Sequence, residues 1–124
     1  MIGYVTLGSN DIPRAAAFYD ALLAEIGGKR FMEADTFVAW MTDAGGGGLG
    51  ITRPFDGNPA TVGNGVMVAL KVDSPALVDA LHAKALQLGG SDEGAPGERM
   101  PGFYAGYFRD LDGNKLNAYF WNAD

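Results

Sequence analysis

Cysteine is absent from this chain of 124 residues, and histidine occurs only once, at His82. The lack of cysteine excludes disulfides, thiolate metal sites and a cysteine nucleophile. A single histidine also excludes a zinc site built from several histidines of one chain. His82 directly follows the apolar Leu81 in a helical pattern. We therefore expect it at the surface or boundary of that helix, without a functional role.

Long apolar runs and an excess of positive charge are missing as well. No stretch approaches the roughly 20 apolar residues that a membrane-spanning helix needs. The first residues, MIGYVTLGSND, show neither the basic nor the apolar segment of a signal peptide. The formal net charge of −6 repels phosphate backbones and anionic membrane surfaces. The sequence thus predicts no nucleic-acid partner and no membrane partner, and it favours a cytoplasmic location.

Hydrophobic residues make up 48% of the chain and charged residues 19%, as is typical of a packed globular protein. The length fits a single domain, residues 1–124. Segments 7–28 and 70–90 share one pattern, an apolar strand end, a turn with proline, a helical periodicity and a glycine pair. This similarity predicts an internal duplication, with repeats at about 1–60 and 61–124.

Each repeat is predicted to contain one helix among four strands. Asp11 or Asn10 can cap the first helix and Ser74 the second, and glycine pairs end both. The expected strands are 2–7, 29–34, 37–42 and 48–53, followed by 65–72, 91–95, 103–109 and 115–121. The fold class is therefore α+β. Two βαβββ modules are expected to form a curved, partly open mixed sheet, with the helices outside and a hollow inside.

The candidate ligand-binding residues come from two observations. Period-two alternation along the first, fifth and last strands separates side chains that point into the predicted hollow from the apolar sets that face the helices. Further aromatic residues, Trp40, Tyr104 and Tyr107, could stack a ligand, with ordinary core packing as the alternative. Arg99 belongs to the stretch APGERMPGF, predicted as a loop that closes over the site. The combination of aromatic, amide and cationic groups suits a small, partly aromatic or apolar molecule. The candidates are Tyr4, Thr6, Trp40, Met67, Arg99, Tyr104, Tyr107, Asn117, Tyr119 and Trp121.

Two motifs favour a structural interpretation over a functional one. The acidic run at 110–114 has the spacing of the first EF-hand ligands. Lys115 and Trp121, however, stand where such a loop requires glycine and glutamate, so we predict a turn between two strands. The glycine run at 45–50 contains G-x-G-x-x-G but leads into a strand, which predicts a hairpin loop. Gly50 is expected to leave space beside the hollow.

Three stretches resemble the vicinal oxygen chelate superfamily, also called the glyoxalase/bleomycin-resistance/dioxygenase family. They are YVTLGSNDIPRAAAFYDALL, VALKVDSPALVDALHAKALQLGG and GFYAGYFRDLDGNKLNAYF, and together they span most of the chain. The last is similar to the family's aromatic strand, D-P-D-G-N turn and final strand, with Leu111 in place of proline. The resemblance implies the glyoxalase-like fold of paired βαβββ modules. It also implies a homodimer, since family members commonly pair.

The resemblance further implies where a divalent metal would be held. Family enzymes place histidine, glutamate or glutamine on the first, fourth, fifth and eighth strands. The matching positions here are Tyr4, Gly50, Met67 and Asn117. None of these is a typical ligand of a divalent cation. We therefore predict a chain without the family's metal and without another cofactor.

Two functional hypotheses from different classes follow. The favoured one is metal-independent binding of a small molecule, in the style of the bleomycin-resistance members. The alternative is a glyoxalase-type lyase or isomerase with a displaced metal or a metal-free route. Its general acid would be Tyr4, Tyr104, Tyr107 or Glu98, and no catalytic residue can be assigned. A third interpretation is a domain that acts only as a dimerisation or interaction module.

Overall fold

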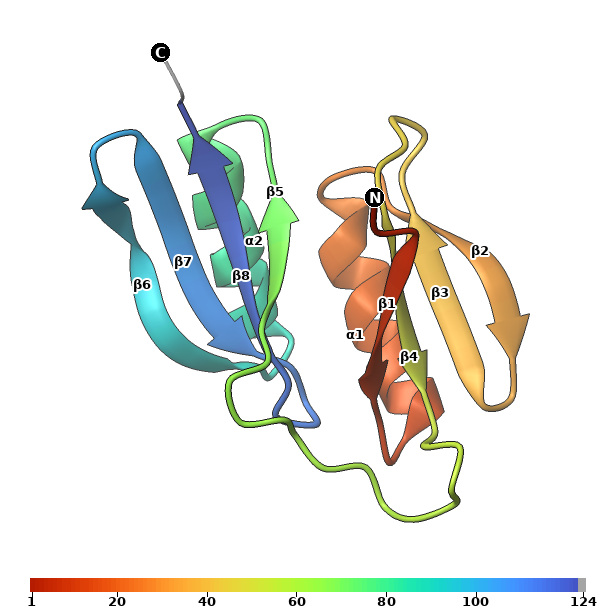
Figure 1. The fold of residues 1–124 in the computed structure, drawn as a ribbon. Coiled ribbons are helices and arrows are strands. Elements are labelled where there is room, and N and C mark those ends of the chain that lie inside the picture. Colours follow the sequence, from red (N-terminus) through yellow and green to blue (C-terminus); the bar gives the residue numbers. More distant parts are fainter. Residues whose placement is uncertain (123–124) are drawn as a thin grey trace. The chain divides into compact units, whose positions relative to one another are not determined.

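The computed structural model describes residues 1–122, and the chain divides into two compact units, Met1–Gly63 and Asn64–Asp124. Each unit contains one helix and four strands in the order βαβββ (Figure 1). The first comprises β1 (Tyr4–Gly8), α1 (Ile12–Ala24), β2 (Lys29–Ala34), β3 (Phe37–Met41) and β4 (Gly48–Thr52). The second comprises β5 (Val68–Lys71), α2 (Pro75–Gln87), β6 (Ser91–Met100), β7 (Phe103–Arg109) and β8 (Lys115–Trp121). This arrangement confirms the predicted α+β class.

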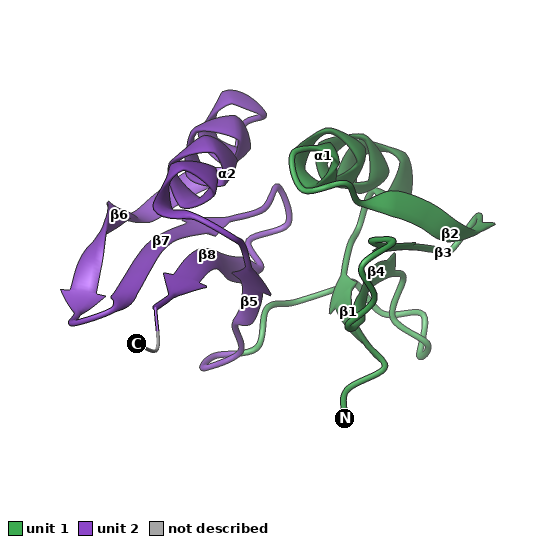
Figure 2. Ribbon diagram, turned by 90° about the horizontal axis from the view of Figure 1, so that it is seen from above, with its two compact units in different colours: residues 1–63 green, residues 64–124 purple. Residues whose placement is uncertain are grey.

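Both sheets are mixed, and they share one topology. The strand orders are β1-β4-β3-β2 in the first unit and β5-β8-β7-β6 in the second. β1 pairs with β4 in parallel and β5 with β8 in parallel, whereas the remaining pairs are antiparallel. In each unit the helix contacts three of the four strands of its own sheet. The opposite face of each sheet carries no helix of the same unit (Figure 2), and we call it the helix-free face.

The helices begin and end at the residues that the sequence indicates. The carboxylate of Asp11 accepts a hydrogen bond from the Arg14 N–H at 3.1 Å. Ser74 Oγ accepts one from the Leu77 N–H at 3.2 Å. Gly27 and Gly89 follow the helices with φ angles of +79° and +101°, the left-handed conformation that glycine adopts most readily. Each helix has 13 residues, and neither is long and apolar enough for a bilayer span.

The two strands whose predicted bounds differ most from the structure both lie at a sheet edge. The sequence predicts a strand at 65–72, but β5 starts only at Val68, after Gly65 with a φ of +96°. β6 extends to Met100, beyond the predicted end at residue 95, and it contains Pro96. Proline is tolerated because one side of an edge strand needs no backbone donor. Arg99 therefore lies in a strand, and the prediction that it belongs to a closing loop is wrong.

His82 is buried in the second unit, so its expected position at the surface or boundary of the helix is wrong. The residue is 6% exposed, and its ring and that of Phe108 meet edge to face with centroids 6.4 Å apart. Nε2 lies 2.9 Å from Oδ1 of Asp92 on β6. The N–H of Gly94 and the His82 ring both lower the pKa of Asp92. His82 thus links α2 to β6 through its contact with Asp92, on the side of the sheet that α2 covers.

The two loop motifs take the structural roles that the sequence predicts. Residues 110–114 join β7 to β8, and Oδ1 of Asp110 accepts the N–H groups of Asp112 and Asn114, both at 2.9 Å. The Asn114 amide donates to the other Asp110 oxygen at 3.0 Å. The glycine run from 45 onward joins β3 to β4 and opens a strand. Both motifs therefore form turns that reverse the direction of the chain between two strands.

Candidate functional site

The helix-free face of the first unit is lined by aromatic rings over glycines. In the strand register, Tyr4 lies opposite Gly48 and Thr6 opposite Gly50. Tyr4 is 61% exposed, and its ring meets that of Phe37 edge to face at 6.5 Å. Thr6 is also exposed. Two predicted residues, Tyr4 and Thr6, therefore share this face with Phe37, which was not predicted.

The glycines of β4 are covered by phenylalanine rings. A Cβ placed on Gly50 would lie 3.0 Å from the Phe37 ring, and one placed on Gly48 would lie 3.1 Å from the Phe31 ring. The prediction that Gly50 leaves free space is therefore wrong, because the Phe37 ring fills it. Phe37 could have been predicted from the alternation of side chains along β3 and β4, which places it on the same face as Gly50. Phe31 lies at a register shift of β2, which no periodicity reveals.

Four aromatic side chains line the helix-free face of the second unit, and we call this set the aromatic face. The Phe103 and Tyr119 rings stack with centroids 5.6 Å apart and an interplanar angle of 28°. Trp121 meets Phe103 edge to face at 5.4 Å and is 46% exposed. Tyr107 lies on the same side of β7 as Phe103. The aromatic face therefore consists of Phe103, Tyr107, Tyr119 and Trp121.

Two cations approach the Tyr107 ring. The guanidinium carbon of Arg99 lies 5.4 Å from the ring centroid, and Nζ of Lys115 lies 5.6 Å from it. Both distances fall within the range of cation–π attraction. Arg99 also donates from Nη2 to the carbonyl oxygen of Ala95 at 2.6 Å. The predicted residues Arg99 and Tyr107 are thus brought together, and Lys115 is a neighbour that the sequence reading missed.

Asn117 carries a buried polar atom without a partner. It lies opposite Tyr107 in the β7–β8 pair and opposite Ala69 in the β5–β8 pair. Its side chain is 2% exposed, and Oδ1 has no hydrogen bond within the described residues. An unpaired buried acceptor is destabilising by about 1–3 kcal/mol. By alternation with Leu116, which is buried on the helix side, Asn117 belongs to the helix-free face.

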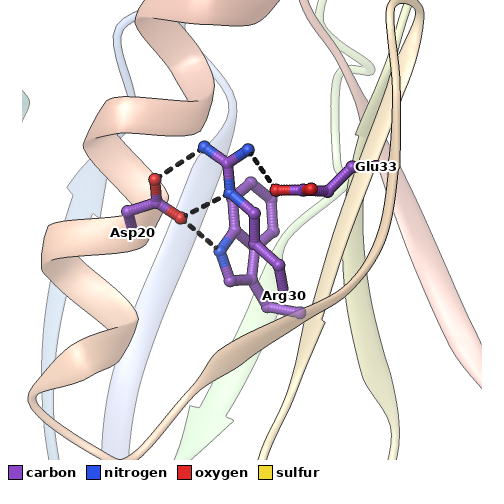
Figure 3. Close-up of polar contacts among 4 residues, drawn as sticks. Asp20, Arg30 and Glu33 are labelled. Carbon is purple, nitrogen blue, oxygen red and sulfur yellow. Dashed lines mark hydrogen bonds and ion pairs between the residues drawn. The ribbon is translucent and has the colours of Figure 1, made fainter.

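Trp40 lies in the core of the first unit, on the side of α1. It is 1% exposed and packs against Tyr19 at 5.6 Å between ring centroids. Its Nε1–H donates to Oδ1 of Asp20 at 2.9 Å. The guanidinium of Arg30 bonds both oxygens of Asp20, at 2.9 and 2.6 Å, and donates to Glu33 at 2.8 Å (Figure 3). Trp40 is therefore part of a structural cluster and leaves the candidate ligand set.

Replacing Asp20 with asparagine tests this cluster through its pH dependence. The Arg30 guanidinium, together with the Trp40 N–H, holds the pKa of Asp20 below its ordinary value of 3.8. A carboxyl group whose pKa is lowered in the folded state stabilises the fold at pH values above its ordinary pKa. This stabilisation is lost as the pH falls through the folded-state pKa. We expect Asp20→Asn to lower the free energy of unfolding by up to about 1 kcal/mol at pH 7, because solvent screens this partly exposed ion pair. The difference in free energy of unfolding between the variant and the wild type should shrink below about pH 4.

The measurement is urea unfolding from pH 2 to pH 7, with Asp35→Asn as the control. Asp35 is exposed in the turn between β2 and β3 and makes no interaction like that of Asp20. The control should match the wild type across the range. An Asp20→Asn deficit that is independent of pH would show that the ionised carboxylate does not stabilise the cluster.

Tyr104 and Met67 also differ from their predicted placement. Tyr104 faces α2, and its hydroxyl donates to Oδ1 of Asp79 at 2.7 Å. This bond to a carboxylate raises the pKa of Tyr104. It lies on the face opposite Tyr107, because neighbouring residues of a strand alternate. Met67 is exposed and precedes β5, so the ladder does not fix its side chain.

The family profile described as the Glyoxalase/Bleomycin resistance protein/Dioxygenase superfamily matches residues 1–118. The chain belongs to this superfamily. No protein with a curated function matches the chain.

Several solved structures are similar to nearly the whole chain. A glyoxalase/bleomycin resistance protein from Albidiferax ferrireducens T118 is 38% identical with a TM-score of 0.88, over 96% of this chain and 97% of that one. The hypothetical protein SA1046 from S. aureus is 26% identical with a TM-score of 0.75, over 97% and 92%. A lactoylglutathione lyase from Agrobacterium tumefaciens shares the fold at 21% identity and a TM-score of 0.70, over 96% and 92%.

The residues at the positions that the resemblance matches to the superfamily's metal ligands do not fit a divalent cation. In the first unit they are Tyr4 and Gly50, and glycine offers no side-chain donor. In the second they are Met67, a soft thioether, and Asn117, a neutral amide. Residues 1–122 contain no group of three or more histidine, cysteine, aspartate or glutamate side chains placed to hold a metal ion. We therefore derive no chemical step through a metal.

Proposed function

We propose that this chain binds a small, partly aromatic or apolar molecule on the helix-free faces of its units, without the divalent metal of the superfamily enzymes. The observation that carries this proposal is the aromatic face of the second unit. Its exposed Trp121 and its stacked rings adjoin the unpaired Oδ1 of Asn117. Apolar surface with a few polar groups that can orient a ligand is typical of small-molecule sites.

Neutral aromatic probes test the proposal, because they carry no charge that could dominate binding. Titration of the ¹⁵N-labelled chain with 2-naphthol or naphthalene-2-methanol should shift the amide resonances of β7 and β8, and those of α2 should shift less. Trp121→Ala should weaken probe affinity about 2- to 10-fold, the magnitude of one aromatic contact.

Tyr104→Phe is the matched control for Trp121→Ala. It removes only a hydroxyl that bonds Asp79 on the opposite face of the sheet, so probe affinity should stay at the wild-type value. The proposal fails if no amide of β7 or β8 moves. It also fails if both variants bind the probe as the wild type does.

Metal analysis tests the proposal that binding does not require a divalent metal. We expect purified protein to contain zinc, nickel, iron or manganese well below one equivalent per chain, because the matched positions lack suitable donors. Treatment with EDTA should leave the affinity for 2-naphthol unchanged. A stoichiometric metal, or a loss of binding with EDTA, would favour the alternative of a lyase or isomerase.

The assembly state is a separate proposal. The superfamily resemblance implies a homodimer, and analytical ultracentrifugation checks it through the sedimenting mass. A species with twice the 13.0 kDa chain mass is expected. A single species at the chain mass would contradict it.

A further inference from the structure

The cations on the helix-free face of the second unit differ from one another in their partners. Arg109 is paired with Glu93 at 2.7 Å. Arg99, Lys115 and Lys71, in contrast, form no ion pair with a carboxylate within residues 1–122. Lys71 lies opposite Tyr119 in the strand register. A chain with a net charge of −6 thus gathers uncompensated positive charge on one face.

This positive charge borders the aromatic face at Tyr107. Arg99 and Lys115 reach that ring from neighbouring strands, at 5.4 and 5.6 Å from its centroid. Of the acidic residues of β6 near this ring, Glu93 is paired with Arg109, and Glu98 lies opposite Tyr104. Because Tyr104 faces α2, Glu98 belongs to the other side of the sheet. An anion beside Tyr107 would therefore meet two cations.

Asn117 supplies the second polar contact. It is the cross-strand neighbour of Tyr107, and its Oδ1 is buried and unpaired. An unpaired oxygen accepts a hydrogen bond, so its partner on a ligand would be a hydroxyl or an amine N–H. Lys115 and Tyr119 flank Asn117 on the same side of β8. Because this oxygen is buried, a ligand hydroxyl would reach it only after neighbouring side chains move.

We propose that the aromatic face binds an aromatic carboxylate that also carries a ring hydroxyl. The carboxylate pairs with Arg99 and Lys115, the hydroxyl donates to Oδ1 of Asn117, and the ring packs against Phe103 and Tyr119. This inference rests on the proposed small-molecule binding and adds the charge and hydrogen-bonding character of the ligand. An aromatic cation is disfavoured on the same face, since it would meet uncompensated positive charge.

A matched probe series tests the charge. The hydroxybenzoates (2-, 3- and 4-), hydroxybenzyl alcohol and hydroxybenzylamine share a hydroxylated ring and differ in charge. By calorimetry at low salt, we expect at least one hydroxybenzoate to bind about 5-fold tighter than the alcohol, and the amine to bind weakest. Added salt should reduce the difference. Equal or tighter binding of the amine would overturn the inference.

Single substitutions assign the roles of the residues. Arg99→Gln and Lys115→Gln should each weaken hydroxybenzoate binding about 3- to 5-fold and leave the alcohol unaffected. Lys84→Gln removes the same charge from the last turn of α2 and should change neither affinity. If all three variants lose hydroxybenzoate affinity equally, the effect is one of net charge and the assigned contacts are wrong.

Asn117→Leu isolates the hydroxyl contact. The wild type should prefer hydroxybenzoate over benzoate about 5-fold, and the variant should bind the two equally. Thermal unfolding provides the structural readout, and the variant should be as stable as the wild type or more so, because it removes an unpaired buried oxygen. An unchanged preference in a folded variant would overturn this contact.

The two levels of the proposal fail in different ways. If neutral naphthalene probes shift the amides of β7 and β8 while the hydroxybenzoates gain nothing from their charge, small-molecule binding stands and the carboxylate inference is wrong. If neither series shifts these amides, both are wrong.

Discussion

Trp40→Ala is expected to lower the free energy of unfolding by about 3–5 kcal/mol, the usual loss for a buried tryptophan. Trp40 is 1% exposed, packs against Tyr19 and donates to Asp20. The same substitution at Trp121, which is 46% exposed, should change stability by less than about 1 kcal/mol. Urea unfolding of both variants gives the comparison.

Substitutions at Trp40 and Trp121 also distinguish a structural role from a role in ligand binding. Trp121→Ala should weaken binding of neutral aromatic probes, while Trp40→Phe, which keeps a ring but loses the N–H to Asp20, should retain it. Trp40→Phe also remains measurable if Trp40→Ala fails to fold. A stable Trp40→Ala variant that lost probe binding would return Trp40 to the ligand site.

Gly90→Ala is expected to lower the free energy of unfolding by about 3 kcal/mol, at the upper end for an overpacked methyl group. A Cβ at this position would lie 2.6 Å from the carbonyl oxygen of Arg109 and 2.9 Å from that of Ala85. Both are backbone atoms, so no side-chain rotation can relieve the contact. Far-ultraviolet circular dichroism against urea concentration measures the loss.

The common βαβββ order of the two units supplies a matched variant, and the chain also offers a control. Gly28 is the equivalent glycine of the first unit, and its Cβ would lie 2.7 Å from Cβ of Leu23 and 3.0 Å from the Leu23 carbonyl oxygen. Gly28→Ala should therefore be comparably destabilising. Gly3→Ala should be neutral, since nothing lies within 4 Å of a Cβ there. Equal stability of all three variants would show that the clashes relax at little cost.

The strands and helices were predictable wherever a local signal exists. Ser74 and the proline after it start α2, and glycine with positive φ ends it. The predicted bounds of β7 and β8 agree with the structure, because apolar and aromatic residues alternate up to a turn. β6 was underestimated, because glycines and Pro96 read as a loop and only pairing with β7 makes them a strand.

Placement of side chains was less predictable than placement of strands. Trp40 and Tyr104 were assigned to the ligand side as aromatic residues, yet each bonds a carboxylate of its unit's helix, Asp20 or Asp79. These carboxylates are distant in the sequence, and no local pattern couples them to the rings. The burial of His82 has the same origin, since Asp92 on β6 becomes its partner only when α2 packs on the sheet.

The amino-acid order by itself determined the βαβββ order, the helix ends and the superfamily, because caps, glycine pairs and periodicity act between residues close in the chain. Only the tertiary structure decided which aromatic rings lie on the helix-free faces. It also decided that Phe37 covers Gly50, that Arg99 and Lys115 meet at Tyr107, and that Oδ1 of Asn117 is left unpaired. These relations depend on strand register, which arises from the packing of segments far apart in sequence.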